Sequence, residues 1–170
     1  MLTYKPDNPR RAWAMGSRFR VAPPEPVRAE VKKGYGGNMA EFWDDPVPLM
    51  TQRLYAALVK SGVSNVDTYA AEIFDPHTSE THRNYVAFNI IGAVAAADLN
   101  NSVFDASSPE RIISVDFDSV AISGEAARAA LLFRLAESVN AIVVHERVKA
   151  ALESEGIDTL TFIRPEEWAG

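Results

Sequence analysis

The residues best suited to metal chemistry lie in one short segment, HTSETHR, at positions 77–83. His77, His82 and Glu80 are of the types that commonly bind zinc. However, the spacing of the two histidines matches neither a helical HExxH site nor a zinc ribbon, and no fourth ligand lies nearby in the sequence. We therefore interpret the segment as a polar loop that follows the turn-forming pair Asp75-Pro76.

Asp116 and Asp118 are a second candidate site, because alternate residues of a β-strand share one face and lie about 7 Å apart. Paired carboxylates can act as acid and base or bind a hard cation, and His145 could serve as a general base. The structural alternative is that both carboxylates lie on the solvated face of a strand and that His145 caps the start of a helix. The sequence favours this alternative, and a small hydrolase or other enzyme that uses Asp116, Asp118 or the histidines is kept as a competing hypothesis.

Sequence signals for nucleophiles and cofactors are absent. The chain has no cysteine, which excludes disulfides, thiolate metal sites and cysteine nucleophiles. It has no GxSxG motif, and the glycine-rich stretch at 34–37 lacks the spacing of a phosphate-binding loop. Because no nucleophile, base and orienting group come together, we predict a binding protein that is not an enzyme and uses no cofactor or metal.

Charge is distributed unevenly along the 170 residues, whose net charge is −6. Residues 1–36 carry eight Lys or Arg and three acids, a local charge of +5, whereas the other 134 residues carry nine and twenty, a local charge of −11. An acidic body attracts a basic protein partner and argues against direct binding of nucleic acid, which needs a dense cationic surface.

The sequence also predicts a cytoplasmic protein without a membrane partner. The N-terminus has no apolar run of the kind found in secretion signals. The longest nearly uncharged stretch covers 13 residues at 85–97, which is too short to span a bilayer.

Hydrophobic periodicity predicts the elements that must position these residues. Apolar stripes predict a helix over 49–60, ended by Gly62, and a helix over 146–155. Alternating or β-branched runs predict strands at 66–74, 84–91, 112–122, 141–144 and 159–164, with a short strand near 17–21. Because the last three elements are joined by short links, a strand, a helix and a strand would close the chain as a right-handed crossover.

These elements predict an α+β fold with a mixed, mainly antiparallel sheet, few helices and a C-terminal strand–helix–strand unit. Hydrophobic residues make up 47% of the chain, which is enough for a sizeable core. Residues 1–45 are basic and rich in Pro and Gly, so we predict an N-terminal extension that packs on an α+β domain over 46–170.

Three stretches resemble a family of bacterial immunity proteins from polymorphic toxin systems, first described as a domain of unknown function. They are VPLMTQRLYAALVKSGVSNVDTY at 47–69, YVAFNIIGAVAAADLNNSVF at 85–104, and LLFRLAESVNAIVVHERVKAALESEGIDTLTFIRP at 131–165. Their order and spacing carry the resemblance, which covers about residues 46–165. The alanine-rich stretch at 125–130 departs from the pattern as an insertion, and residues 1–45 match it only loosely.

The resemblance implies that the chain neutralises a cognate toxin, the C-terminal toxin domain of a larger effector, by stoichiometric protein–protein binding. It supplies no catalytic residues. Many such toxins are nucleases with basic clefts, in which an acidic inhibitor would mimic the charge of the substrate. For the partner-binding surface we select residues that combine charge or aromatic character with expected exposure: Trp43, Asp44, Asp45, Asp116 and Asp118. A regulatory protein that binds something other than a toxin is the remaining alternative.

Overall fold

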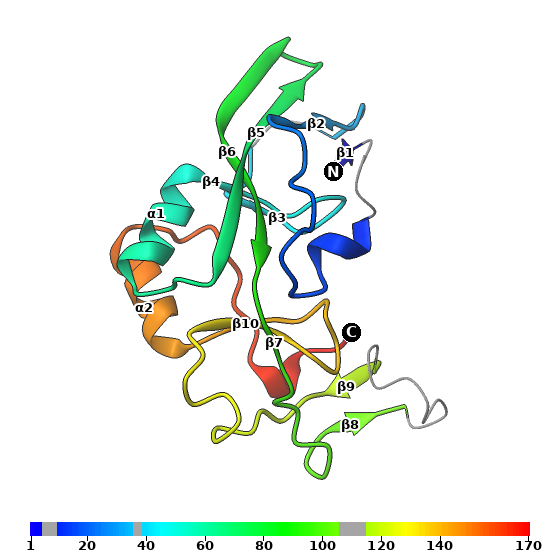
Figure 1. Ribbon diagram of the computed structural model, residues 1–170, viewed down its shortest axis with the longest axis vertical. Coiled ribbons are helices and arrows are strands. Elements are labelled where there is room, and N and C mark those ends of the chain that lie inside the picture. Colours follow the sequence, from blue (N-terminus) through cyan, green and yellow to red (C-terminus); the bar gives the residue numbers. More distant parts are fainter. Residues whose placement is uncertain (5–9, 36–38, 106–114) are drawn as a thin grey trace.

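The computed structural model describes residues 1–4, 10–35, 39–105 and 115–170. Within these ranges the chain forms two α-helices and eleven strands in three sheets, and most strand pairs are antiparallel (Figure 1). The predicted α+β class with a mixed, mainly antiparallel sheet is therefore confirmed. Neither helix of the described chain is long and apolar enough to cross a membrane.

The largest sheet has six strands in the order β1-β2-β5-β6-β4-β3. Their bounds are β1 (Leu2–Tyr4), β2 (Val27–Val31), β5 (Val66–Asp75), β6 (Glu80–Ile90), β4 (Leu49–Thr51) and β3 (Phe42–Trp43). β2 and β5 are parallel, and the other neighbours are antiparallel. β5 and β6 form a long hairpin whose turn is held by Asp75, because its carboxylate accepts a hydrogen bond of 2.8 Å from the His77 N–H.

Helix α1 (Gln52–Lys60) is shorter than predicted, because residues 49–51 belong to β4. Thr51 has an extended backbone, and its hydroxyl accepts a hydrogen bond of 3.1 Å from the Leu54 N–H. It therefore caps the helix, and the apolar residues before it face a strand partner instead. Gly62 ends the helix as predicted, with a φ of +99° that favours glycine.

A second sheet, with the order β11-β10-β7, lies beside the first. Its strands are β11 (Ile142–Val144), β10 (Leu132–Leu135) and β7 (Ala93–Val94). A third pair, β8 (Val103–Phe104) and β9 (Phe117–Ser119), lies at the lower end of Figure 1. β9 covers part of the predicted strand at 112–122, of which residues 112–114 lie outside the described residues. The predicted alternation is present around β9, where Phe117 is buried and Asp116 and Asp118 are exposed.

The predicted closing strand at 159–164 is wrong. β11 and helix α2 (Glu146–Ser154) form as expected, but residues 158–164 pair with no strand of the described chain. The alternation that predicted a strand is real, because Leu160 and Phe162 are half-buried while 159, 161 and 163 are exposed. The alternation indicates an extended segment that packs on the core, and it does not show that the segment belongs to a sheet. The predicted strand–helix–strand crossover is therefore not formed.

The N-terminal segment contributes three strands of the largest sheet. The predicted strand near 17–21 is wrong, and β1, β2 and β3 were missed because they are short and lie among prolines and glycines. Trp13, in the short 3₁₀ helix η1 (Arg10–Trp13), is fully buried against Phe19 and Tyr69, with ring centroids 4.7 and 5.7 Å away. The division into 1–45 and 46–170 stays a prediction.

Candidate binding surfaces

The structure separates the five predicted partner-binding residues into two places. Trp43 is in β3, at one edge of the six-stranded sheet, and Asp44 and Asp45 follow it. Asp116 and Asp118 lie at β9, at the lower end of the molecule in Figure 1, whereas β3 lies near its middle. The chain therefore offers two separate surfaces rather than one continuous patch.

Asp44 forms an ion pair with a buried arginine of the second sheet. Its Oδ1 lies 3.2 Å from Nη2 of Arg134 in β10, and Arg134 is only 1% exposed. Nη1 of Arg134 also donates a hydrogen bond of 2.7 Å to the Val139 carbonyl oxygen. The Asp44 side chain is 41% exposed, so one part of the carboxylate contacts solvent while another joins the two sheets.

Trp43 is half-buried beside Tyr85 of β6, and its indole N–H is directed at the Tyr85 hydroxyl without reaching full hydrogen-bond geometry. The Tyr85 hydroxyl donates a hydrogen bond of 2.7 Å to the Ala40 carbonyl oxygen. Burial raises the pKa of Tyr85 above its ordinary value of 10.0; Trp43 opposes this effect, and the nearby Glu41 adds to it. Trp43 therefore contributes to the core as well as to the surface.

The second surface carries four exposed acidic residues. The C-terminal residues pair with β9, because Phe117 and Gly170 exchange two backbone hydrogen bonds of 3.0 Å. The short helix η2 (Pro165–Glu167) contacts β9, and its Glu166 and Glu167 are exposed like Asp116 and Asp118. We call these four residues the acidic end; sequence analysis selected only the two aspartates, since the contact between η2 and β9 is invisible in the sequence.

The histidines have separate environments. His77 is exposed in the β5–β6 turn, and His82 lies within β6 opposite Ile73, not in the loop that the sequence suggested. His145 caps α2, because its Nδ1 accepts a hydrogen bond of 3.0 Å from the Arg147 N–H. No three His, Asp or Glu side chains of the described chain group as metal ligands would.

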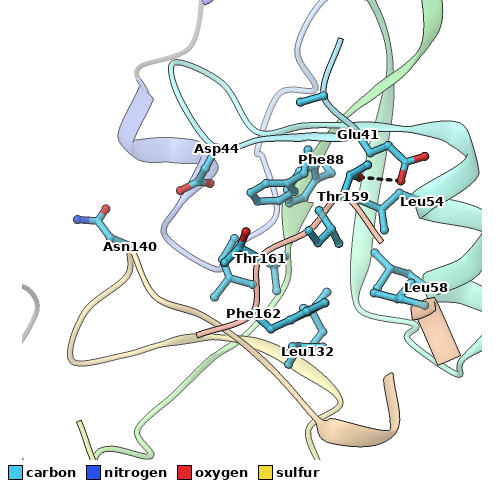
Figure 2. A pocket seen from close by; sticks show the side chains of 17 residues that line it. Glu41, Asp44, Leu54, Leu58, Phe88, Leu132, Asn140, Thr159, Thr161 and Phe162 are labelled. Carbon is cyan, nitrogen blue, oxygen red and sulfur yellow. Dashed lines mark hydrogen bonds between the residues drawn. The ribbon is translucent and has the colours of Figure 1, made fainter. Parts of the chain in front are cut away.

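A cavity of about 360 Å³ lies between the two larger sheets, next to β3. Its apolar wall comes from α1, β6, β10, β11 and α2, and residues 159–162 cross it (Figure 2). Ala40, Glu41, Phe42 and Asp44 line its other side. Sequence reasoning missed this site, although the alternation at 159–163 was a visible signal of an extended segment lying on apolar residues.

Arg53 of α1 joins the chain that follows α2 to Glu41, which lines this cavity. Its Nη2 donates hydrogen bonds of 3.0 and 2.7 Å to the carbonyl oxygens of Glu155 and Gly156, just after α2. Its Nη1 lies 3.0 Å from Oε1 of Glu41, and Oε2 of Glu41 accepts a hydrogen bond of 3.5 Å from the Thr159 hydroxyl. Helix α1 thus holds the segment after α2 close to the residues before β3 (Figure 2).

Comparison with known proteins gives one family. The model of the immunity protein family Imm11 matches residues 4–166, nearly the whole chain. The match includes β2 and β3 and begins at the last residue of β1, all of which lie outside the region of resemblance found in the sequence. No curated protein matches the chain.

Proposed function

Because the chain belongs to the Imm11 immunity protein family, we propose that it neutralises a cognate toxin by stoichiometric protein–protein binding. The observation that carries the proposal is the family match over residues 4–166, which includes every described strand except the first two residues of β1. In this proposal the partner is the C-terminal toxin domain of a larger effector, and the complex forms in the cytoplasm of the producing cell.

The toxin class proposed here is a nuclease with a basic cleft. The acidic end supports this proposal, since Asp116, Asp118, Glu166 and Glu167 are all exposed around β9 and η2. Acidic side chains facing a basic cleft raise the association rate and take the place of the phosphates that the cleft binds. A cognate toxin with an acidic active site would contradict this part of the proposal.

The edge of the six-stranded sheet is proposed as the second contact. Trp43 supplies an aromatic side chain of the kind that dominates binding energies at protein interfaces, and Asp44 and Asp45 are exposed beside it. Since Asp44 is also paired with Arg134, a partner that binds here contacts a carboxylate whose position is already fixed.

We propose that neutralisation involves no chemistry by this chain. In support, His145 has a structural role at the start of α2, where its ring nitrogen accepts a backbone hydrogen bond. The competing hypothesis of a hydrolase assigns the chemistry to Asp116, Asp118 or the histidines. The two hypotheses differ in stoichiometry, because an inhibitor stops at one molecule per toxin while an enzyme acts on many.

The test is coexpression with the toxin domain encoded beside the gene for this chain. We expect growth to be restored and a 1:1 complex to be purified, and titration of the purified toxin should reach full inhibition at one equivalent. Absence of both rescue and copurification would contradict the proposal. Full inhibition well below one equivalent, lost on substitution of Asp116, Asp118, His82 and His145 by alanine, would favour the enzyme.

Salt dependence tests the role of the acidic end. Replacing Asp116 and Asp118 by asparagine should lower the association rate and weaken its dependence on ionic strength. Replacing Glu30 of β2 and Glu80 of β6, two exposed glutamates, by glutamine is a control that removes the same number of charges elsewhere on the surface. An equal fall in the two proteins would show that total charge matters and the acidic end does not.

A further inference from the structure

Residues 158–163 have the form of a strand without the pairing of one. Leu160 and Phe162 pack against the core cluster that contains α1, α2 and β6, while Thr159, Thr161 and Ile163 are exposed. No backbone N–H or C=O of 158–163 forms a hydrogen bond with the described part of the chain. Strands at the edge of a sheet present such unpaired groups to other chains, so this segment offers a row of donors and acceptors that is free to pair.

The segment lies beside an apolar cavity whose other walls also end in open strand edges. β3 is the last strand of the six-stranded sheet, and β11 is the last strand of the three-stranded sheet. Residues of both line the cavity, together with Phe88, Leu132 and Phe162 (Figure 2). Its volume, about 360 Å³, lies within the range that holds a small ligand or a large side chain.

We propose that the segment 158–163 is the edge to which the toxin adds an extended strand. This inference rests on the proposed function and specifies the surface that it uses. Strand addition takes its affinity from main-chain hydrogen bonds and its specificity from alternate side chains that enter pockets. The occupant is therefore an extended segment of the toxin with a large apolar side chain, which enters the cavity beneath Leu160 and Phe162.

The segment is held in place for such an addition before any partner arrives. Arg53 fixes the carbonyl groups of Glu155 and Gly156, and Glu41 accepts a hydrogen bond from Thr159. These contacts lie at the start of the segment and involve no backbone group of 158–163. An edge that is already ordered loses little conformational freedom on pairing, which favours binding.

Hydrogen exchange on the full chain, alone and with the inactivated toxin domain, tests the proposal. We expect the amides of 158–163 to exchange rapidly in the free protein, and alternate amides of this segment, those that face the added strand, to exchange at least about tenfold more slowly in the complex. A 1:1 complex in which these amides are unprotected would overturn the inference and leave the proposed function intact. Protection of the same amides without toxin, with a dimer in light scattering, would identify a second copy as the occupant and also overturn it. Absence of any complex would instead overturn the proposed function on which the inference rests.

A pair of variants at one position separates backbone pairing from side-chain contact. Thr161→Pro removes an N–H that has no partner in the described chain, whereas Thr161→Ala keeps it. We expect Thr161→Pro to weaken toxin binding about tenfold or more and Thr161→Ala to change it less than about twofold. Equal affinities, with thermal unfolding unchanged and with the amides of 160 and 162 unprotected in the complex, would refute strand addition to this segment; if Thr161→Pro does not fold, the hydrogen-exchange result decides.

Discussion

The ion pair between Asp44 and Arg134 gives the most direct test of how the two larger sheets are held together. Arg134 is 1% exposed and has two acceptors, the Val139 carbonyl oxygen at 2.7 Å and Asp44 Oδ1 at 3.2 Å. We consider Asp44→Asn, which keeps the shape of the side chain and one acceptor oxygen but removes the negative charge beside the buried guanidinium.

The expected cost lies between two limits. Breaking a fully buried pair destabilises a protein by about 3–5 kcal/mol, and breaking a surface pair costs about 0–1 kcal/mol. Because the Asp44 side chain is 41% exposed, solvent screens the pair in part. We therefore expect Asp44→Asn to lower the free energy of unfolding by about 1–2 kcal/mol, which corresponds to a fall in Tm of about 3–6 °C.

Urea denaturation of four proteins measures this effect: the wild type, Asp44→Asn, Arg134→Met and the double variant. Arg134→Met should cost about 2–3 kcal/mol, because it leaves the Val139 carbonyl oxygen without its donor. In the Arg134→Met background, Asp44→Asn should cost less than about 0.5 kcal/mol. The same change at exposed Asp118 is the control and should stay within about 0.5 kcal/mol. An equal cost of Asp44→Asn in both backgrounds would refute the assignment to Arg134.

Three further predictions concern the packing and the helix ends. Tyr85→Phe should lower the free energy of unfolding by about 1 kcal/mol through loss of the hydrogen bond to the Ala40 carbonyl oxygen. Because the folded state raises the pKa of Tyr85, the stability of the wild type should hold below pH 10 and fall as the pH rises through the folded pKa. Urea titrations between about pH 9 and 11 should show a weaker dependence on pH for Tyr85→Phe than for the wild type. Thr51→Ala should cost about 1 kcal/mol and Thr51→Ser much less, since serine keeps the capping oxygen; equal losses in thermal unfolding would contradict the cap. Gly62→Ala should cost about 1–2 kcal/mol in urea, because Gly62 has a φ of +99° and a Cβ there would lie 3.4 Å from Leu131 Cδ1; an unchanged midpoint would show that the backbone relaxes.

Local patterns predicted the long elements of this fold well. Strand β5 and the helices α1 and α2 have residues that repeat with the period of a strand or a helix over nine or ten positions. Strand β6 was predicted from a nearly continuous apolar run, and only from residue 84 onward. β1 and β3 span only two or three residues, too few for a period to be visible. β2 does alternate, with Val27, Ala29 and Val31 buried, but this signal was missed among the surrounding prolines and glycines. Their position in the sheet comes from partners such as β5, which lie far along the chain.

The closing segment and the candidate surface show that a sequence pattern can predict burial without predicting which residues are paired. Alternation at 159–163 predicted half-burial correctly, but burial on one face does not specify a hydrogen-bonded neighbour. Asp44 was expected to be exposed, and it is, yet its partner Arg134 lies 90 residues away and was hidden in the apolar motif Leu-Phe-Arg-Leu. Contacts between distant residues therefore decide what an exposed carboxylate does, and a single sequence does not contain them.

The strand order of the largest sheet also determines when each strand can find its partner during translation. β2 ends at Val31 and its neighbour β5 begins at Val66, 35 positions later, which is roughly 2–7 s of translation at about 5–20 residues per second. Arg134 is translated 90 positions after Asp44, which is about 5–18 s later at the same speed. The β5–β6 hairpin can pair as soon as it leaves the ribosome, and β1 can pair with β2, but the other edge of β2 has no partner until β5 has been made. A chain released before position 134 would lack β11 and half of β10, so the second sheet would be missing and Asp44 would have no arginine to pair with.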